Sequence, residues 1–378
     1  MLKIIIVAGA RPNFMKVAPL VEAMNRRSAD FQSILVHTGQ HYDAAMSDAF
    51  FRDLEMPEPD VDLGVGSSSH AVQTAEVIRA FEPYVISGRP DWVLVVGDVN
   101  STVACALVCA KLNVKVAHVE AGLRSRDRRM PEEINRLLTD QIAELLLTPS
   151  RDADANLLAE GIPPERIRFV GNIMIDSLRK HLPLAGKSTI RESLGLAEKD
   201  YALLTLHRPS NVDELQTLGG ILDALNAIGN RLPIVFPVHP RTLKMVAELG
   251  LERKLTNARG LLLTDPLGYL DFLQLLSGAR LVLTDSGGIQ EETTVLGIPC
   301  ITLRENTERP ITVEQGTNTI AGTDTAKIVA AANRALDNPP DKSALQTPEL
   351  WDGRTADRIL DALIERTRQL EGKSESGV

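Results

Sequence analysis

Short runs of Val, Ile and Leu alternate with longer helical segments along the chain, and this alternation restricts the fold more than any other feature. The runs of the first half occupy residues 4–9, 33–39, 92–98, 114–120 and 167–172. Those of the second half occupy residues 201–207, 232–240, 260–266, 279–288 and 298–303. A continuous apolar run predicts a strand buried on both faces, and alternation with helices predicts βα units in a parallel sheet. We therefore predict an α/β fold of two Rossmann-like, doubly wound domains.

The two series of runs meet near residues 171–185, where GNIMIDSL gives way to the Pro- and Gly-containing stretch HLPLAGKST. We accordingly predict an N-terminal domain over 1–175 and a C-terminal domain over 176–350. The last segment, 351–378, is predicted to be one more helix followed by a disordered tail. A length of 378 residues is compatible with two domains of ordinary size.

Composition excludes several classes of protein. The chain has 41 basic and 50 acidic side chains, a net charge of −9, which argues against a nucleic-acid partner. Its three cysteines, Cys105, Cys109 and Cys300, exclude a disulfide scaffold and fit a reducing cytoplasm. No uncharged apolar run approaches the ~20 residues needed to cross a membrane, and the N-terminus does not resemble a signal peptide. We expect a cytoplasmic protein with no membrane partner.

Polar residues follow many of the predicted strands. They include Arg11, Asp98, Glu120, His207, His239 and Ser286. Ligands of open α/β sheets bind at the carboxyl ends of the strands, so we expect these residues at one site. With two such domains, that site is predicted in the cleft between them.

One candidate phosphate site is GARPNFMK, residues 9–16. Gly9 ends a strand, Pro12 suits the first turn of a helix, and Arg11 and Lys16 then lie near a helix N-terminus that favours anions. The alternative is ordinary surface charge at a helix start. The segment lacks GxGxxG, so no dinucleotide fingerprint is present.

A second candidate is TDSGGIQEE, residues 284–292. Ser286 lies at a strand end, and Gly287 and Gly288 allow a ligand to approach the backbone before a helix whose dipole could hold a diphosphate. Glu292, further along that helix, could accept hydrogen bonds from a ribose. The alternative is an N-capped helix with exposed glutamates, but a cap does not require two glycines.

Two carboxylates, Asp98 and Glu120, each close an apolar strand. A carboxylate there is costly unless it is paired or functional. Either both serve in catalysis, or they form structural ion pairs with Arg124 and Arg126 nearby in the chain.

The remaining polar candidates have simple structural alternatives. Glu132, in PEEINR, fits the first turn of a helix and could form a surface pair with Arg136 one turn later. His207 and His239 each follow a strand and could be structural. The seven histidines show no HxxxH or HxH spacing, so no protein-made metal site is predicted.

Taken together, the motifs resemble those of the non-hydrolysing UDP-N-acetylglucosamine 2-epimerases of bacteria and archaea. The matching stretches, in family order, are GARPNFMKVAPL, TGQHYD, GDVNSTVA, HVEAGLR, PEEINRLLTD, LHRPSNVDE, VHPRT, DSGGIQEE and NTERPITVEQGT. The resemblance implies a GT-B type fold and a homodimer. It also implies a UDP-sugar substrate and a role in supplying precursors of cell-surface polysaccharides.

The resemblance also implies roles for individual residues. The positions matching catalytic residues are Asp98, Glu120, Glu132 and His207. The positions matching substrate- or UDP-binding residues are Arg11, Lys16, His239, Phe272, Ser286, Gly287, Gly288, Glu292 and Arg309. Of these, Phe272 matches a residue near the uracil, and Arg309 a substrate-binding arginine.

The family chemistry explains why such residues are needed. The C2 hydrogen of the sugar is not acidic, so the family eliminates UDP across C1–C2 to 2-acetamidoglucal and adds it back on the inverted centre. This route requires carboxylates as acid and base, and groups that hold UDP while it is free. It implies no cofactor and no metal ion.

Departures from the family pattern keep alternatives open. Tyr42-Asp43 stand where well-known members carry Arg-Glu, in a region that contributes to an activator site in some relatives, and Arg208-Pro209 stand where Arg-Arg-Glu is usual. The sugar could therefore be UDP-2,3-diacetamido-glucuronate, or the enzyme could be of the hydrolysing type. A GT-B glycosyltransferase and a non-catalytic nucleotide-sugar sensor are the alternatives from other classes.

Overall fold

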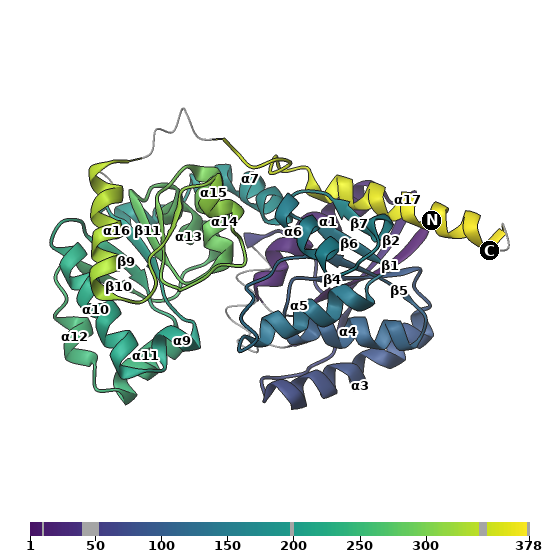
Figure 1. Cartoon of the computed structure of the whole chain (residues 1–378), viewed down its shortest axis with the longest axis horizontal. Helices are drawn as coiled ribbons and strands as arrows, with labels where there is room; N and C mark the ends of the chain where they lie inside the picture. Colours follow the sequence, from purple (N-terminus) through teal and green to yellow (C-terminus); the bar gives the residue numbers. More distant parts are fainter. Residues whose placement is uncertain (10, 40–52, 197–199, 340–345, 376–378) are drawn as a thin grey trace. The chain divides into compact units, whose positions relative to one another are not determined.

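The computed structural model describes the chain except residues 10, 40–52, 197–199, 340–345 and 376–378, with the backbone alone at 11–12 and 373–375. The chain forms two compact units, residues 1–179 with 349–378, and residues 180–348 (Figure 1). Each unit contains one parallel sheet, so the predicted α/β class is confirmed. Tyr42 and Asp43 lie outside the described residues.

The first unit is built on a seven-stranded parallel sheet with the order β3-β2-β1-β4-β5-β6-β7. Its strands are β1 (Leu2–Ala8), β2 (Phe31–His37), β3 (Val61–Asp62), β4 (Trp92–Val96), β5 (Lys115–Val119), β6 (Leu145–Thr148) and β7 (Ile167–Phe169). Its helices are α1 (Arg11–Arg26), α3 (His70–Gly88), α4 (Asn100–Lys111), α5 (Pro131–Ile142), α6 (Arg151–Ala159) and α17 (Thr355–Glu375), with a 3₁₀ turn at Pro164–Arg166. Helix α7 (Ile173–Ala185) contains the boundary between the units.

Helices cover both faces of this sheet because its strands are apolar on both faces. Ile5 and Val7 of β1 belong to a buried cluster with residues of α3 and α4. Ile4 and Ile6 are also buried, and since alternate side chains of a strand point to opposite faces, they pack on the other side. Helix α1 contacts β1, β2 and α17.

The C-terminal segment packs on the first unit although the second unit precedes it in the chain. Trp351 is 1% exposed, and its indole N–H donates to the carbonyl oxygen of Pro149 at 2.9 Å. The carboxylate of Asp176 accepts the backbone N–H groups of Thr355 and Ala356, at 3.1 and 2.8 Å, and so caps α17. This helix continues to Glu375, well into the segment for which the sequence predicts a disordered tail.

The second unit is built on a six-stranded parallel sheet with the order β10-β9-β8-β11-β12-β13. Its strands are β8 (Ala202–Thr205), β9 (Ile234–Pro237), β10 (Leu261–Thr264), β11 (Leu281–Thr284), β12 (Cys300–Thr302) and β13 (Asn318–Ile320). Its helices are α8 (Ile190–Ser193), α9 (Pro209–Val212), α10 (Leu215–Gly229), α11 (Pro240–Glu248), α12 (Glu252–Thr256), α13 (Tyr269–Ser277), α14 (Gly287–Leu296), α15 (Ile311–Glu314) and α16 (Thr325–Asp337).

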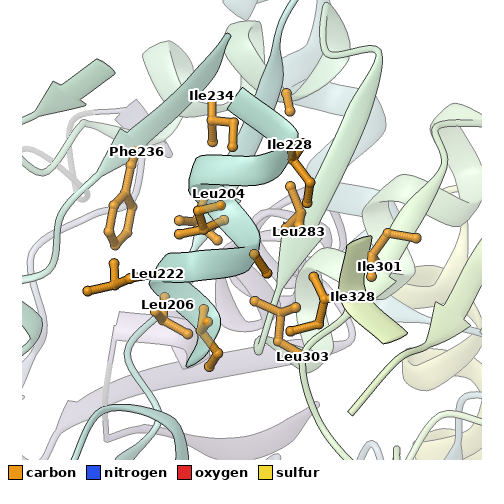
Figure 2. Close-up of a cluster of buried hydrophobic side chains, with 14 of the residues drawn as sticks. Leu204, Leu206, Leu222, Ile228, Ile234, Phe236, Leu283, Ile301, Leu303 and Ile328 are labelled. Atoms are coloured by element: carbon orange, nitrogen blue, oxygen red, sulfur yellow. The ribbon is translucent and has the colours of Figure 1, made fainter. Parts of the chain in front are cut away.

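One core of this unit lies between the sheet and helices α10 and α16. Leu222 and Ile228 of α10 and Ile328 of α16 face Leu204 and Leu283 of the central strands (Figure 2). All five side chains are at most 1% exposed. Burial of an aliphatic side chain of this kind contributes about 1.5–3 kcal/mol to folding.

The strand orders locate a switch point in each sheet. In the first sheet, strand numbers decrease from β3 to β1 and then increase from β4 to β7, so the switch point lies between β1 and β4. In the second sheet they decrease from β10 to β8 and then increase from β11 to β13, so the switch point lies between β8 and β11. Ligands of doubly wound sheets bind at such switch points, outside the carboxyl ends of the strands. Asp98 follows β4, His207 follows β8 and Ser286 follows β11, so these predicted site residues lie near the switch points.

Candidate active site

In the first unit, the predicted residues lie on segments that follow neighbouring strands. Lys16 belongs to α1, which follows β1; Asp98 and Glu120 follow β4 and β5, the next strands across the sheet. Arg11 is the first residue of α1, and its side chain lies outside the described part of the structure. The sheet order therefore brings these segments to one edge of the first unit.

Glu120 has a strained backbone and a buried carboxylate. Its φ is 73°, in the left-handed region that side chains other than glycine rarely adopt, at a cost of about 1–3 kcal/mol. Its backbone N–H donates to Leu147 O at 3.0 Å, which holds this conformation. Its carboxylate pairs with the ammonium of Lys16, and the two side chains are 4% and 9% exposed.

Asp98 is held by the guanidinium of Arg136. Arg136 Nη1 lies 2.5 Å from the Asp98 carboxylate, and Nη2 lies 2.7 Å from Glu133. Burial raises the pKa of Glu133, but the Ser125 backbone N–H and Arg136 outweigh it, so this pKa is lowered. The alternative prediction, that Asp98 and Glu120 form ion pairs with the nearby arginines, is therefore wrong. Arg124 pairs with Asp140 and Glu160 instead.

Glu132 differs from its neighbour Glu133. It is half-buried, and it makes no hydrogen bond or ion pair with any residue that the structure describes. The expected surface pair with Arg136 is wrong because Arg136 is 2% exposed and turned towards Asp98 and Glu133. Glu132 is therefore a carboxylate with no structural partner in the described chain.

In the second unit, Asp285 organises the residues around His207. One oxygen of its carboxylate accepts the backbone N–H groups of His207 and Arg208, both at 2.8 Å, and the other lies 3.1 Å from His207 Nδ1. Burial raises the pKa of Asp285, but His207 and the backbone donors outweigh it, so the pKa is lowered. This contact fixes the ring of His207, whose side chain is 44% exposed, and directs Nε2 away from Asp285.

His239 lies near His207, with ring centroids 5.9 Å apart. Its Nδ1 accepts the backbone N–H of Arg241 at 3.1 Å and so caps α11. Because Nδ1 accepts, the proton of the neutral ring resides on Nε2, which becomes a donor on an exposed side chain. The two histidines form a polar patch that could contact an anion.

The start of α14 has the form predicted for a phosphate-binding loop. Ser286 occupies the N-cap position, yet its side chain accepts no capping hydrogen bond from the described helix N–H groups. A Cβ at Gly287 would lie 2.4 Å from Arg309 Nη1 and 2.7 Å from Glu308 Oε1. A side chain at this position would have to displace the buried Arg309–Glu308 pair, so glycine lets the loop pack directly against that pair.

Arg309 lies behind this loop and is paired within the protein. It is 6% exposed, with Nε 2.7 Å from Glu291 and Nη1 2.5 Å from Glu308. Burial raises the pKa of Glu308, but Arg309, Arg304 and Arg208 outweigh it, so the pKa lies well below its usual value. Arg309 therefore supports the loop from the inside.

Glu292 is buried further along α14. Burial raises its pKa to about 8, against the smaller opposing effect of the Tyr269 hydroxyl, which donates to Oε1 at 3.3 Å. The Tyr269 pKa is raised as well, by burial and by Glu292. Phe272, also on α13 and one turn after Tyr269, is half-buried.

Among the residues that the structure describes, no group of three or more His, Cys, Asp or Glu could hold a metal ion. No helix of the described chain is long and apolar enough to span a membrane.

Comparison with known proteins shows the family to which the chain belongs. The family model for UDP-N-acetylglucosamine 2-epimerase matches residues 22–364. The chain belongs to the UDP-N-acetylglucosamine 2-epimerase family, a family of isomerases. This confirms the resemblance found in the sequence motifs.

Three members of the family illustrate the likeness. A Methanococcus maripaludis UDP-N-acetylglucosamine 2-epimerase homolog is 46% identical, over 87% of this chain and 91% of its own. A Pseudomonas aeruginosa UDP-2,3-diacetamido-2,3-dideoxy-D-glucuronate 2-epimerase is 42% identical, over 89% and 92%. The crystal structure of the Methanocaldococcus jannaschii UDP-GlcNAc 2-epimerase in complex with UDP-GlcNAc and UDP has a TM-score of 0.89 at 40% identity, over 96% of this chain and 100% of its own. The predicted GT-B type fold is therefore confirmed.

Several buried side chains that hold the candidate site residues or their neighbours were not predicted from the sequence. They are His118, Glu133, Asp140, Tyr269, Asp285 and Glu308. One signal was available: Glu133, Arg136 and Asp140 are spaced i, i+3 and i+7 in the sequence, which places them on one face of α5. The strand-end residues Asp98 and Glu120 carried a clearer signal, because an acid after an apolar run stands out.

Proposed function

We propose that the chain catalyses the reversible epimerisation at C2 of UDP-N-acetylglucosamine to UDP-N-acetylmannosamine. The observation that carries the proposal is the pair of carboxylates, Asp98 and Glu120, on turns after adjoining strands, each with its own cation. The carboxylate of Glu132, which pairs with no residue in the described part of the chain, lies on the helix that also supplies Arg136. Removing a proton from one face of a carbon and returning one to the other requires such a set of acids and bases.

In the proposed reaction, a carboxylate takes the proton from C2 while the C1–O bond breaks and its electron pair leaves with the diphosphate. The products of this step are 2-acetamidoglucal and UDP. UDP then adds back to C1 as a proton is delivered to C2 on the opposite face. The acid and base roles belong to Asp98, Glu120 and Glu132, and His207 would donate to the departing diphosphate.

The second unit would retain UDP between the two steps. The start of α14 at Ser286, Gly287 and Gly288 suits a diphosphate, because N–H groups of a first helical turn have no acceptor within the helix and the positive end of the dipole favours an anion. Glu292 would contact the ribose, and Phe272 the uracil. The Lys16, Arg11 and His239 side chains would supply cationic or donor groups towards the substrate, and Arg309 would act through the loop that it supports.

A second candidate substrate has specific support. The P. aeruginosa relative named for UDP-2,3-diacetamido-2,3-dideoxy-D-glucuronate is 42% identical, close to the 46% of the M. maripaludis homolog. Sequence identity to these relatives therefore does not decide which of the two sugars this chain would use. Either reaction would invert C2. A homodimer in the cytoplasm that supplies polysaccharide precursors completes the proposal.

Proton NMR of the purified protein with UDP-GlcNAc in D₂O, with no cofactor added, tests the proposal. UDP-ManNAc with deuterium at C2 is the expected product. Accumulation of UDP and free ManNAc would indicate a hydrolysing enzyme instead, and an unchanged spectrum would direct the assay to the diacetamido sugar. The variants Asp98→Asn and Glu120→Gln should lose orders of magnitude in rate, whereas Glu76→Gln, in an exposed ion pair with Arg79 on α3, should not.

A further inference from the structure

Two fully buried titratable side chains, His118 and Asp140, lie next to the turns of Asp98 and Glu120, and the proposed reaction does not use them. Nδ1 of His118 lies 2.6 Å from Oδ1 of Asp140, and Nε2 lies 2.7 Å from the carbonyl oxygen of Gly97. Both side chains are 0% exposed. Water therefore does not compete for these hydrogen bonds.

The partners of His118 determine where its protons are. A carbonyl oxygen only accepts hydrogen bonds, and so does an ionised carboxylate. Burial raises the pKa of Asp140, but His118 and Arg124 outweigh it and lower the pKa, so the carboxylate is ionised. Both ring nitrogens then donate, which requires a doubly protonated ring.

The charges around the pair agree with this assignment. Arg124 Nη1 lies 2.7 Å from the second oxygen of Asp140, and the same guanidinium forms two hydrogen bonds to Glu160 at 2.6 and 2.7 Å. Cation and anion alternate along His118, Asp140, Arg124 and Glu160. With a positive charge on His118, the four side chains together have no net charge.

The pair connects to both carboxylate-bearing turns. Gly97, whose carbonyl oxygen accepts from His118, directly precedes Asp98. Gly122, whose N–H donates to Asp140 Oδ2 at 3.1 Å, follows Glu120 by two residues. One buried ion pair thus holds the backbone on the C-terminal side of β4 and of β5.

The turn of Glu120 contains a conformation that needs such support, because Glu120 is left-handed and is not a glycine. Gly97 has φ 69° and Gly122 has φ 81°, and Glu120 between them in the chain is also left-handed at 73°. Asn135 of α5 adds a second contact to the first turn, since its amide donates to Asp98 O at 2.9 Å. Without these contacts the carboxylates would not keep their positions.

We propose that His118 and Asp140 are positioning residues for the epimerase, forming a buried imidazolium–carboxylate pair that holds the turns of Asp98 and Glu120 at a fixed separation. Neither side chain reaches the substrate. The kinetic consequence rests on the proposed function, whereas the protonation of the ring does not depend on it.

Two variants of His118 separate its two hydrogen bonds. Asparagine places an amide N–H near the position of Nδ1 and keeps the bond to Asp140 alone, whereas glutamine places it near Nε2 and keeps the bond to Gly97. We expect His118→Asn to lower kcat about 10–100-fold with KM unchanged, because displacement of reacting groups by about 1 Å has this effect. His118→Gln should lower kcat in the same way, because each variant breaks one of the two bonds through which His118 connects the turns of Asp98 and Glu120.

The ring itself is tested by NMR of the unmodified protein labelled with ¹⁵N-histidine. A long-range ¹H–¹⁵N correlation spectrum distinguishes rings with one proton from rings with two, and loss of one signal in His118→Gln assigns it. We expect the signals of a ring with two protons, because both of its nitrogens face acceptors. This measurement remains decisive if a variant fails to fold.

Two results would overturn the proposal: a singly protonated His118 ring, or a folded His118→Asn or His118→Gln variant with the kcat of the natural chain. Folding of each variant is checked by the fluorescence of Trp92 and Trp351, which both belong to the same unit as His118. If the natural chain shows no epimerase activity, the proposed function fails, and the spectrum still decides the charge of the pair.

Discussion

Replacement of Lys16 by methionine should destabilise the first unit strongly. The substitution keeps the length of the side chain but removes the cation that pairs with Glu120, and this carboxylate is only 4% exposed. Breaking a buried pair from one side costs about 3–5 kcal/mol, because the remaining charge has no compensation. For a unit of roughly 200 residues this lowers the midpoint of thermal unfolding by about 6–20 °C.

The corresponding double variant distinguishes pairing from simple loss of contacts. Glu120→Gln alone should also destabilise the unit, because it leaves the ammonium of Lys16 beside a neutral amide. The combination of Lys16→Met with Glu120→Gln contains no uncompensated charge. Its cost should therefore be smaller than the sum of the single costs, by about 1–3 kcal/mol.

Tryptophan fluorescence during urea unfolding is a suitable assay, because the chain has only two tryptophans and both are buried in the first unit. Trp92 is 0% exposed and Trp351 is 1% exposed. Arg79→Met provides a matched control, since the Arg79 side chain is 78% exposed and its pair with Glu76 should contribute about 0.2–1 kcal/mol. Strictly additive single effects, or a Lys16→Met cost no larger than that of the control, would refute the assignment of a buried coupled pair.

Three further predictions concern other parts of the chain. Gly287→Ala should weaken UDP binding about tenfold or more in calorimetry, because the added Cβ displaces a buried ion pair at a cost of about 1–3 kcal/mol. Gly219→Ala in α10 is the control: its Cβ would lie 3.6 Å or more from its neighbours, so it should leave UDP binding unchanged and raise stability in thermal unfolding by about 0.4–1 kcal/mol. The pKa of Glu292 is raised from its ordinary value to about 8, so the unfolded chain releases this proton near pH 4.5 while the native state holds it. Its contribution to stability should decrease by on the order of 4 kcal/mol as pH rises from about 5 to 8. Glu292→Gln should remove this part of the slope, whereas Asp176, whose pKa is raised to about 6, keeps its own contribution. Asp176→Ala leaves two backbone N–H groups of α17 without their acceptor and should lower the free energy of unfolding by about 0.5–2 kcal/mol. Hydrogen exchange over residues 355–375 should become faster, and unchanged exchange there would show that the cap contributes nothing.

Much of the fold was predictable from the sequence because burial and periodicity are local properties. A run such as WVLVV leaves no polar face, so it can only be a strand covered on both sides, and β4 is such a strand, buried at every position. Acids that follow such runs, as at Asp98 and Glu120, were recognisable as site candidates for the same reason. The short strands β3 and β13 have only two and three residues and carry no comparable signal.

Partners were not predictable in the same way. Nearby arginines in the chain were the expected partners of Asp98 and Glu120, yet the structure pairs Glu120 with Lys16, more than a hundred positions earlier, and Asp98 with Arg136. Sequence proximity predicts contact only within one helix or turn. The order of strands in the sheet decides which turns become neighbours, and that order is not written in any single segment.

The sequence by itself determined the two series of βα units, the strand-end positions of the polar residues and the family to which the chain belongs. Tertiary structure alone decided the left-handed backbone at Glu120, the return of α17 to the first unit and the buried pair of His118 and Asp140. The first set follows from residue types and their spacing along one segment. The second depends on groups brought together from distant segments, where exclusion of water makes each unpaired charge or N–H costly and so selects its partner.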